Sequence, residues 1–201
     1  MKIIGVSASP KKRISTTRFA LEKALESVEK QGVETLHINL AEYAFNGCHD
    51  CGLCRSKLTC SQKDDYTEIL LPLLSDPEVI GFIFATPVYF GGMSSQLKAF
   101  FDRTLPIRRN GFLWDKKVAG TITVGAARHG GQELAAFDII KAALISGMTI
   151  VPDASPTSHF GGALWSKIEG GIEADELGIL QAQNIGKRVA EVAVALSPLN
   201  Q

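Results

Sequence analysis

Short, continuously apolar runs alternate along the chain with longer segments in which apolar residues recur every three or four positions. The first pattern predicts strands buried on both faces, and the second predicts amphipathic helices. The expected strands are residues 2–7, 34–40, 79–85, 118–124 and 148–151. The expected helices follow residue 17 and begin near residues 64, 94, 132 and 173, and residues 105–116 and 153–171 are less regular. The alternation predicts one doubly wound α/β domain, residues 1–201, with a five-stranded parallel sheet.

Length and composition suit a single domain with a full core. The chain has 201 residues, 45% of them hydrophobic, and a formal net charge of zero. Its basic residues are scattered, which argues against nucleic acid or an anionic membrane as a partner. The longest apolar run, near residues 79–84, is far too short to span a bilayer. The chain begins with a strand-like run rather than a signal-peptide pattern, so clustered thiols predict the reducing cytoplasm.

All four cysteines lie in one segment after the second predicted strand, within a loop of residues 47–63. They are Cys48, Cys51, Cys54 and Cys60, with the spacing C-x2-C-x2-C-x5-C. Three thiolates at such intervals on a tight turn can reach three corners of a compact iron–sulfur cubane, and the fourth can fold back to the last corner, as in ferredoxins. Gly47 and Gly52 allow the backbone to wrap closely. This cysteine window therefore predicts a cluster site.

Other interpretations of the cysteine window stay open. Four cysteines also bind zinc, although structural zinc sites usually use two well-separated pairs and this run would crowd a tetrahedral site. Two disulfides would require an oxidising compartment. His49 is expected to be exposed or adjacent to the site, because four thiolates complete a ligand set. We expect Asp50, Asp64 and Asp65 to be capping or surface charges.

In an open parallel sheet, ligands bind beyond the carboxyl ends of the strands, where the strand order reverses. For the strand order 2-1-3-4-5, this crevice lies between the first and third strands. The loops of residues 7–17, 86–92 and 125–131 should therefore converge there. No G-x-G-x-x-G follows the first strand and no G-x-x-x-x-G-K-[ST] occurs, which disfavours a dinucleotide site and excludes a P-loop.

Each of these three loops carries groups that suit FMN. Hydroxyls and backbone N–H groups at a helix start form a cup for a phosphate, although ordinary helix capping explains them equally well. Glycines in the second and third loops let backbone amides approach a planar ring, and an arginine can donate to its pyrimidine end; the competing interpretation is simple turns and a surface arginine. The candidate FMN-binding residues are Ser9, Arg13, Ser15, Thr16, Thr17, Pro87, Val88, Tyr89, Phe90, Gly91, Gly125, Arg128, Gly130 and Gly131.

Together these segments resemble the iron–sulfur flavoproteins within the NADPH-dependent FMN reductase group of flavodoxin-like folds. The similar pieces cover nearly the whole chain. The cysteine window is the most specific piece, because flavin reductases of this fold without a cluster lack it. The pieces are Ser-Ala-Ser-Pro at 7–10, Ser15-Thr16-Thr17, the cysteine window with Lys63-Asp64-Asp65, Thr86 to Gly91, Gln96-Leu97-Lys98, Asp102-Arg103, Arg128 to Glu133 and Gly162 to Lys167.

The resemblance implies a [4Fe-4S] cluster on Cys48, Cys51, Cys54 and Cys60, with FMN held by the three loops. It also implies a homo-oligomer, typically a tetramer, in which the cluster of one subunit can face the FMN of a neighbour. We expect Trp114 and Trp165, in the less regular stretches, to pack at a subunit interface rather than to cover the flavin.

A cluster that passes single electrons and a flavin that takes one or two would convert between one-electron and two-electron partners. The leading hypothesis is an electron-transfer flavoprotein that accepts electrons from a ferredoxin-like donor and passes them to a small-molecule or protein acceptor. No dedicated acid–base pair is expected. The alternative is an NAD(P)H-dependent FMN or quinone reductase whose cysteine window binds zinc or is structural. A third hypothesis, a non-enzymatic redox or iron sensor, predicts no useful turnover.

Overall fold

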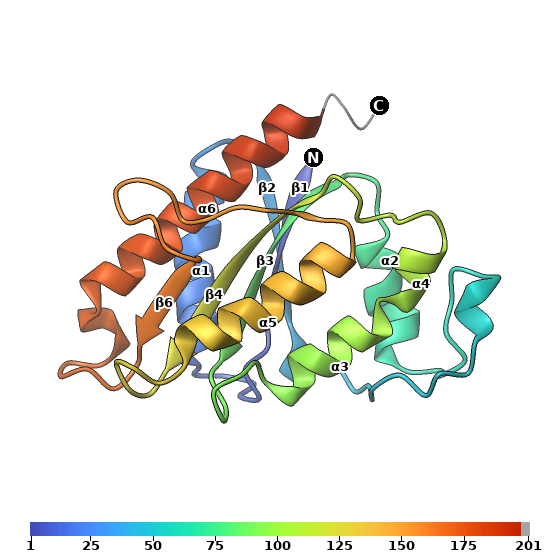
Figure 1. The fold of residues 1–201 in the computed structure, drawn as a ribbon, viewed down its shortest axis with the longest axis horizontal. Helices are drawn as coiled ribbons and strands as arrows, with labels where there is room; N and C mark the ends of the chain where they lie inside the picture. The colour runs from blue at the N-terminus through green and yellow to red at the C-terminus, as the bar shows by residue number, and fades with distance from the viewer. Residues whose placement is uncertain (198–201) are drawn as a thin grey trace.

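The computed structural model describes residues 1–197, which form a twisted sheet with helices on both faces (Figure 1). The sheet is parallel and its strand order is β2-β1-β3-β4-β5, which confirms the predicted flavodoxin-like order. The strands are β1 (Lys2–Ser7), β2 (Glu34–Asn39), β3 (Val79–Pro87), β4 (Val118–Gly125), β5 (Thr149–Ile150) and β6 (Gly162–Trp165).

The central strand shows why the apolar runs are continuous. β3 is buried along its whole length except at Pro87, its last residue. Its side chains alternate between two cores: Ile83 packs on one face of the sheet, and Phe82 and Phe84 pack on the other. Because both faces are covered by helices, both sets of side chains are mostly apolar, and the buried hydroxyl of Thr86 near the end of the strand is hydrogen-bonded.

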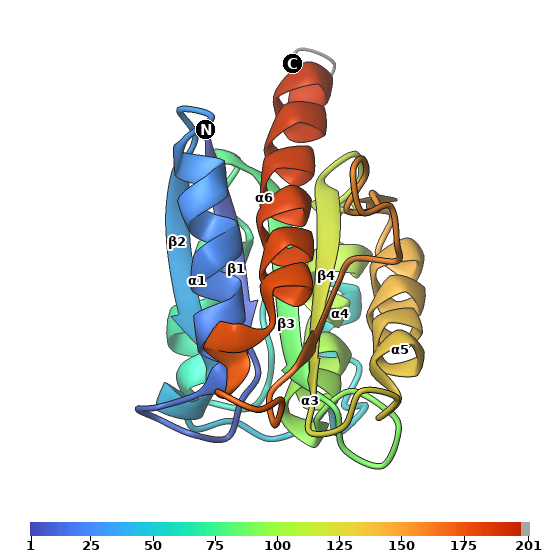
Figure 2. The ribbon, with the colours of Figure 1, turned by 90° about the vertical axis from the view of Figure 1, so that its left-hand side faces the viewer.

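The helices of the first layer pack closely against each other. On one face α1 (Thr16–Glu29) and α6 (Glu176–Leu196) lie side by side (Figure 2). A Cβ at Gly186 would come within 2.1 Å of the Ala24 carbonyl oxygen, so glycine permits this close approach. The helices of the opposite face are α2 (Leu71–Leu74), α3 (Ser95–Arg103), α4 (Leu105–Arg109) and α5 (Gln132–Ile145).

Within residues 1–197, no helix is both long enough and apolar enough to cross a membrane.

The edge of the sheet beside β4 contains an additional strand. β5 pairs with the beginning of β4 and β6 pairs with its end, where Gly125 lies opposite Trp165. The sheet therefore has six strands rather than the predicted five, with two short strands sharing one side of β4. β6 spans only four residues, too few to display a recognisable period in the sequence.

Two predicted helical boundaries also differ. The helix expected from residue 64 begins as a π-helical turn, η3 (Tyr66–Leu70), before continuing as α2. Pro72 lacks the N–H of an ordinary helical hydrogen bond, and the preceding Leu71 N–H reaches back five residues to the Tyr66 carbonyl. The closing helix expected from residue 173 begins as a separate turn, η4 (Ile172–Ala174), followed by α6.

The expectation for Trp114 is wrong. This side chain is fully buried, and its ring centroid lies 4.7 Å from that of Phe82. Its indole N–H donates to the Leu74 carbonyl (3.0 Å). It belongs to the core beneath α4, a helix in a stretch expected to be irregular. Pro106, near the first position of α4, is the sequence signal for a helix start at this point.

Candidate cofactor-binding sites

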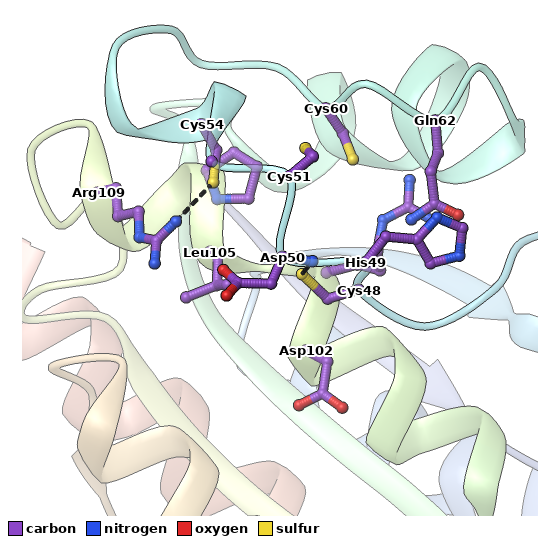
Figure 3. A pocket seen from close by; sticks show the side chains of 13 residues that line it. Cys48, His49, Asp50, Cys51, Cys54, Cys60, Gln62, Asp102, Leu105 and Arg109 are labelled. Atoms are coloured by element: carbon purple, nitrogen blue, oxygen red, sulfur yellow. Dashed lines mark hydrogen bonds between the residues drawn. The ribbon is translucent and has the colours of Figure 1, made fainter.

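The cysteine window follows β2 and the single-turn helix η1 (Leu40–Glu42) and lies against α3 and α4. Its four cysteines line one hollow, where Figure 3 shows their side chains around a common space. Cys54 is buried in the short helix η2 (Leu53–Arg55), Cys60 is half-buried, and Cys48 and Cys51 are exposed. Gly52 begins this turn with a φ of +78°, which favours glycine. The structure thus brings the four predicted ligands to one place.

Three of the sulfurs accept hydrogen bonds from nearby groups. Such donors stabilise a thiolate, the form of cysteine that binds metal. The bond from the Ser61 hydroxyl, reinforced by backbone N–H groups, lowers the pKa of Cys51. The three pairs are Ser61 Oγ to Cys51 Sγ (2.9 Å), Arg109 Nη1 to Cys54 Sγ (3.1 Å) and Asp50 N to Cys48 Sγ (3.3 Å).

Arg103, the last residue of α3, joins the two ends of the cysteine window. Its side chain is 1% exposed. Nη1 donates to the Asn46 carbonyl (2.9 Å) and to Asp64 Oδ2 (2.7 Å), and Nη2 donates to Asp64 Oδ1 (2.9 Å) and Thr67 Oγ1 (3.0 Å). The guanidinium carbon lies 4.8 Å from the Tyr66 ring centroid. This clamp connects the residues before Cys48 with those after Cys60.

The expected capping or surface role of Asp64 is therefore incomplete. Its Oδ1 does cap the backbone N–H of Thr67 (3.2 Å), but its main partner is the buried Arg103. Burial raises the pKa of Asp64, yet the hydrogen bonds from Arg103 and Thr67 and the charge of Arg103 together outweigh this effect and hold the pKa below its usual value. Asp65 accepts from the Ala44 N–H (2.7 Å), and Asp50 is exposed as expected.

A second anchor comes from the end of α4, which the sequence did not indicate. Asn110 Nδ2 donates to the carbonyl oxygens of Cys54 (3.0 Å), Lys57 (3.2 Å) and Pro106 (2.8 Å). Together with the bond from Arg109 to Cys54, this fixes the η2 turn from outside the window. These two residues could have been found from sequence only by first predicting α4.

The donors and spacing fit an iron–sulfur cluster better than one zinc ion or two disulfides. The four cysteines are free thiols. A zinc site requires its sulfurs about 2.3 Å from one point, and among residues 1–197 no three His, Cys, Asp or Glu side chains are grouped to hold a single ion. A cubane is ligated at its outer corners, so its thiolates surround a larger body. The four cysteines around one hollow suit that arrangement.

The first loop of the predicted crevice leads from β1 into α1. The Ser15 hydroxyl caps α1 by accepting from Arg18 N–H (3.2 Å), so the ordinary capping interpretation applies to it, while its own O–H can still donate. α1 has no acidic residue in its first turn, which leaves its positive end free to attract an anion. The buried Ser7 hydroxyl has no partner within the described residues. These features fit a phosphate at this end of β1.

The remaining candidates in this loop differ in exposure. Ser9 and Thr17 are buried, Thr16 is half-buried and Arg13 is exposed. Ser9 Oγ accepts from the Lys11 N–H (3.3 Å), which stabilises the turn. Arg13 thus stands outside the packed part of the loop, where it contributes charge rather than structure.

The second loop forms a tight tip after β3. Tyr89 and Gly92 exchange two backbone hydrogen bonds of 3.0 Å, and Phe90 at the tip is fully exposed with a φ of +50°. Val88 N–H donates to the Val124 carbonyl (3.0 Å), so Pro87, Val88 and Gly91 are held beside the end of β4. The predicted residues 87–91 therefore lie at the carboxyl edge of the sheet.

Ser94 ties the second loop to the first. Its hydroxyl donates to the Ala8 carbonyl (2.9 Å), and its N–H donates to Thr86 Oγ1 (2.9 Å). The same hydroxyl caps α3 by accepting from Leu97 N–H (3.4 Å). The two loops expected to flank the crevice are therefore connected directly, through a residue absent from the candidate list.

The third loop is shaped by Gln132, which lies in the Arg128–Glu133 segment of the resemblance but was given no role among the candidate residues. Its Oε1 accepts from Gly130 N–H (2.8 Å), and its Nε2 donates to the Ala127 carbonyl (2.7 Å). A Cβ at Gly125 would lie 2.4 Å from this side chain, and a Cβ at Gly131 would lie 2.9 Å from Gly91 Cα. The predicted glycines thus permit close packing of the second and third loops.

The end of β6 and the residue after it hold the third loop through hydrogen bonds to its backbone. Trp165 Nε1 donates to the Ala126 carbonyl (3.0 Å), and the Ser166 N–H and hydroxyl both donate to the Gly125 carbonyl (2.8 and 3.0 Å). Trp165 is half-buried and stabilises the loop rather than standing free. Arg128 is exposed on the loop.

A groove of about 380 Å³ lies beside the cysteine window, among α3, α4 and α5. Its lining includes Cys48 from the cysteine window and Met93 from the segment after the second crevice loop. Asp138 of α5 accepts from Met93 N–H (3.2 Å) on the same groove. The groove therefore extends from the cysteine window to the residue that follows the second crevice loop, and its lining includes none of the candidate FMN-binding residues.

Comparison with known proteins identifies the family. Residues 1–162 match the NADPH-dependent FMN reductase family. An iron–sulfur flavoprotein of Methanocaldococcus jannaschii is 42% identical over 192 residues, which cover 96% of this chain and 97% of that protein. The chain belongs to the iron–sulfur flavoproteins of this family. The resemblance predicted from the cysteine window and the three loops is confirmed.

Solved structures support the flavodoxin-like fold of this iron–sulfur flavoprotein. A flavone reductase superimposes with a TM-score of 0.73 and 19% identity, over 98% of this chain and 64% of that longer chain. A WrbA-like flavodoxin from Agrobacterium tumefaciens superimposes with a TM-score of 0.60 and 19% identity, over 96% of this chain and 97% of that one. At these identities the similarity concerns the fold alone.

Proposed function

We propose that this iron–sulfur flavoprotein transfers electrons between a [4Fe-4S] cluster and FMN. The family makes the chain a flavin-dependent oxidoreductase with FMN and an iron–sulfur cluster as its cofactors. The observation that carries the electron-transfer proposal is the hollow lined by all four cysteines, three of which accept hydrogen bonds at sulfur. Cys48 of this hollow and Met93, the residue that follows the second crevice loop, line one groove.

The residues at the two sites have separate tasks. Cys48, Cys51, Cys54 and Cys60 would hold the cluster, and the three crevice loops would hold FMN, its phosphate at the start of α1. When bound, the cluster supplies one-electron transfer and FMN accepts one or two electrons. Ser61 and Arg109 stabilise thiolates through their hydrogen bonds. Ser94 and Gln132 hold the crevice loops in place, so that a bound ring meets a rigid backbone.

Partners are inferred from the surface and from the cofactors. A ferredoxin-like protein would supply single electrons to the cluster, and a small molecule or a second protein would accept them from the flavin side. Large apolar side chains are exposed on α5 and α6, including Leu134 (62%), Ile145 (66%) and Leu177 (60%). Their exposure supports the proposal that the chain forms a homo-oligomer, a tetramer by resemblance. The free thiols support a reducing compartment, the cytoplasm.

Metal, acid-labile sulfide and flavin analysis of anaerobically purified protein tests the proposed function. We expect about four irons and four sulfides per chain, with a broad absorbance beneath the flavin bands. In a rapid-mixing experiment, reduced ferredoxin should bleach the cluster absorbance before the flavin. One zinc, no sulfide and rapid flavin bleaching by NADPH would instead support the reductase alternative.

A further inference from the structure

The buried guanidinium of Arg103 has one donor more than its protein partners use. Arginine carries five N–H donors in a fixed planar fork. Four are taken by the Asn46 carbonyl, the two Asp64 oxygens and Thr67 Oγ1. The fifth, Nε–H, is buried and has no partner among residues 1–197. Buried donors are rarely left unpaired, so this one calls for an acceptor.

The surroundings of Arg103 indicate the kind of acceptor. Arg103 lines the same hollow as the four cysteines, and its side chain is excluded from water. Arg109 on the same hollow donates to Cys54 Sγ, so one guanidinium already contacts a sulfur here. Sulfurs of iron–sulfur clusters commonly accept hydrogen bonds, and these bonds raise the reduction potential because they stabilise added negative charge.

We propose that Arg103 is a positioning residue for the iron–sulfur cluster, whose Nε–H donates to a cluster sulfur while its two Nη groups clamp the ends of the cysteine window. The Nη contacts fix the path of the chain before Cys48 and after Cys60. The Nε–H adds a hydrogen-bond donor from a charged group to a sulfur of the cluster. One residue thus sets both the shape of the loop and the potential of the group that it holds. This inference rests on the presence of the cluster.

A purely structural clamp would use the same Nη contacts, so the test must observe Nε. Protein would be prepared with arginine labelled with ¹⁵N at Nε alone, and the reduced cluster examined by pulsed EPR. We expect a ¹⁵N coupling in the unaltered protein. Because Arg109 approaches Cys54 through Nη1, an Arg109→Lys variant should retain the coupling. Absence of any Nε coupling in cluster-loaded protein would overturn the proposal.

Substitution provides a second readout. Arg103→Lys keeps the charge but lacks the fork and Nε. We expect a more negative midpoint potential and about tenfold faster loss of iron to a chelator. The matched control is Arg108→Lys on α4, whose Nε donates to the Ile145 carbonyl (2.9 Å) and whose guanidinium lies 4.9 Å from the Phe112 ring centroid. The control should leave both quantities unchanged.

The outcomes separate this inference from the proposed function. Faster iron loss from Arg103→Lys with an unchanged midpoint potential would reduce Arg103 to a clamp and overturn the hydrogen bond to sulfur. If Arg103→Lys fails to fold, the labelled unaltered protein still decides the question. Protein that contains no iron or sulfide would refute the proposed function itself, before any arginine is tested.

Discussion

The cysteine window and the loops of the flavin crevice both follow the carboxyl ends of parallel strands but are held by different forces. The window is fixed from outside by charged and amide side chains of neighbouring helices, chiefly Arg103 with Asp64 and, from α4, Asn110. The crevice loops are fixed by strand ends, by backbone contacts and by glycines that allow close approach, such as Gly131 against Gly91.

This difference indicates which substitutions should damage each site. A loop without regular structure needs partners for its backbone groups, and a buried ion pair supplies them only while both partners are charged. Loops that continue parallel strands are positioned by the sheet. Their conformation therefore depends on close packing rather than on charge. Changes of charge should therefore damage the window, and changes of volume should damage the crevice.

The largest effect is expected from Cys51→Ala. Removal of one of four thiolates should abolish the cluster while FMN stays bound, because the crevice uses none of the window's side chains. Iron, sulfide and flavin contents of the purified variant check this. His49→Ala, which changes an exposed neighbour, is the control and should keep both cofactors. Loss of FMN together with the cluster would show that the two sites are not separate.

Asp64→Asn should have the next largest effect, because it leaves the charge of Arg103 buried without its partner. We expect the free energy of unfolding to fall by about 3 kcal/mol, measured by denaturant titration, with faster loss of iron and little change in FMN affinity. Asp65→Asn is the matched control, since Asp65 accepts a single backbone hydrogen bond from Ala44. Equal effects of the two variants would contradict the role given to the ion pair.

The same pair gives a pH dependence with a defined sign. Because the pKa of Asp64 is lower in the folded protein than its usual value, the ionised carboxylate stabilises the fold. Its contribution is complete above the unfolded-state pKa of about 4 and disappears as the pH falls through the lower folded-state pKa. Stability curves of the unaltered protein and of Asp64→Asn should therefore converge in acid.

Gly131→Ala should damage the crevice instead. At a φ of +93°, the left-handed conformation costs an alanine about 1 kcal/mol, and the contact of 2.9 Å with Gly91 Cα adds about 1–2 kcal/mol. FMN affinity should fall while iron content stays constant. Gly32→Ala isolates the first cost, because Gly32 has a φ of +77° but open space around its Cβ position. Equal losses in the free energy of unfolding in both variants would exclude the contact between loops as a cause.

The smallest effect is expected from Ser94→Ala, which removes the link to the Ala8 carbonyl and the cap of α3. A loss of about 1 kcal/mol in stability is expected, with a modest rise in the dissociation constant for FMN measured by fluorescence titration. Ser56→Ala removes an exposed hydroxyl that donates to the Leu53 carbonyl (3.3 Å) and should change neither quantity. Weakened cluster binding in Ser94→Ala would contradict the separate support of the two regions.

Prediction from sequence succeeded where local pattern and fold agree. The apolar runs gave β1, β3 and β4 to within one or two residues, because strands covered on both faces leave little freedom for polar positions. The four cysteines were recognised from spacing, and the structure gathers them on one hollow. The roles of the individual FMN-binding candidates stay predictions, although most of those residues lie at the carboxyl ends of β1, β3 and β4.

Most of the errors concern contacts between distant positions or very short elements. Trp114 and Asp64 are separated from their partners Leu74 and Arg103 by 40 and 39 positions, and such contacts leave no periodic signal in a single sequence. β6 and α4 are only four and five residues long, so their pairing and packing rather than their own pattern define them. Gln132 was overlooked because a polar residue at a helix start is usually a surface residue.

By itself, the sequence determined the order of strands and helices, the cysteine window and the glycine-rich loops, because these depend on hydrophobic period and on spacing along the chain. The side chains that support them became visible in the folded chain: Arg103 and Asp64 at the window, and Ser94 and Gln132 at the crevice. Those side chains act across distant parts of the chain, where the free energy of a contact depends on burial and geometry rather than on neighbouring residues.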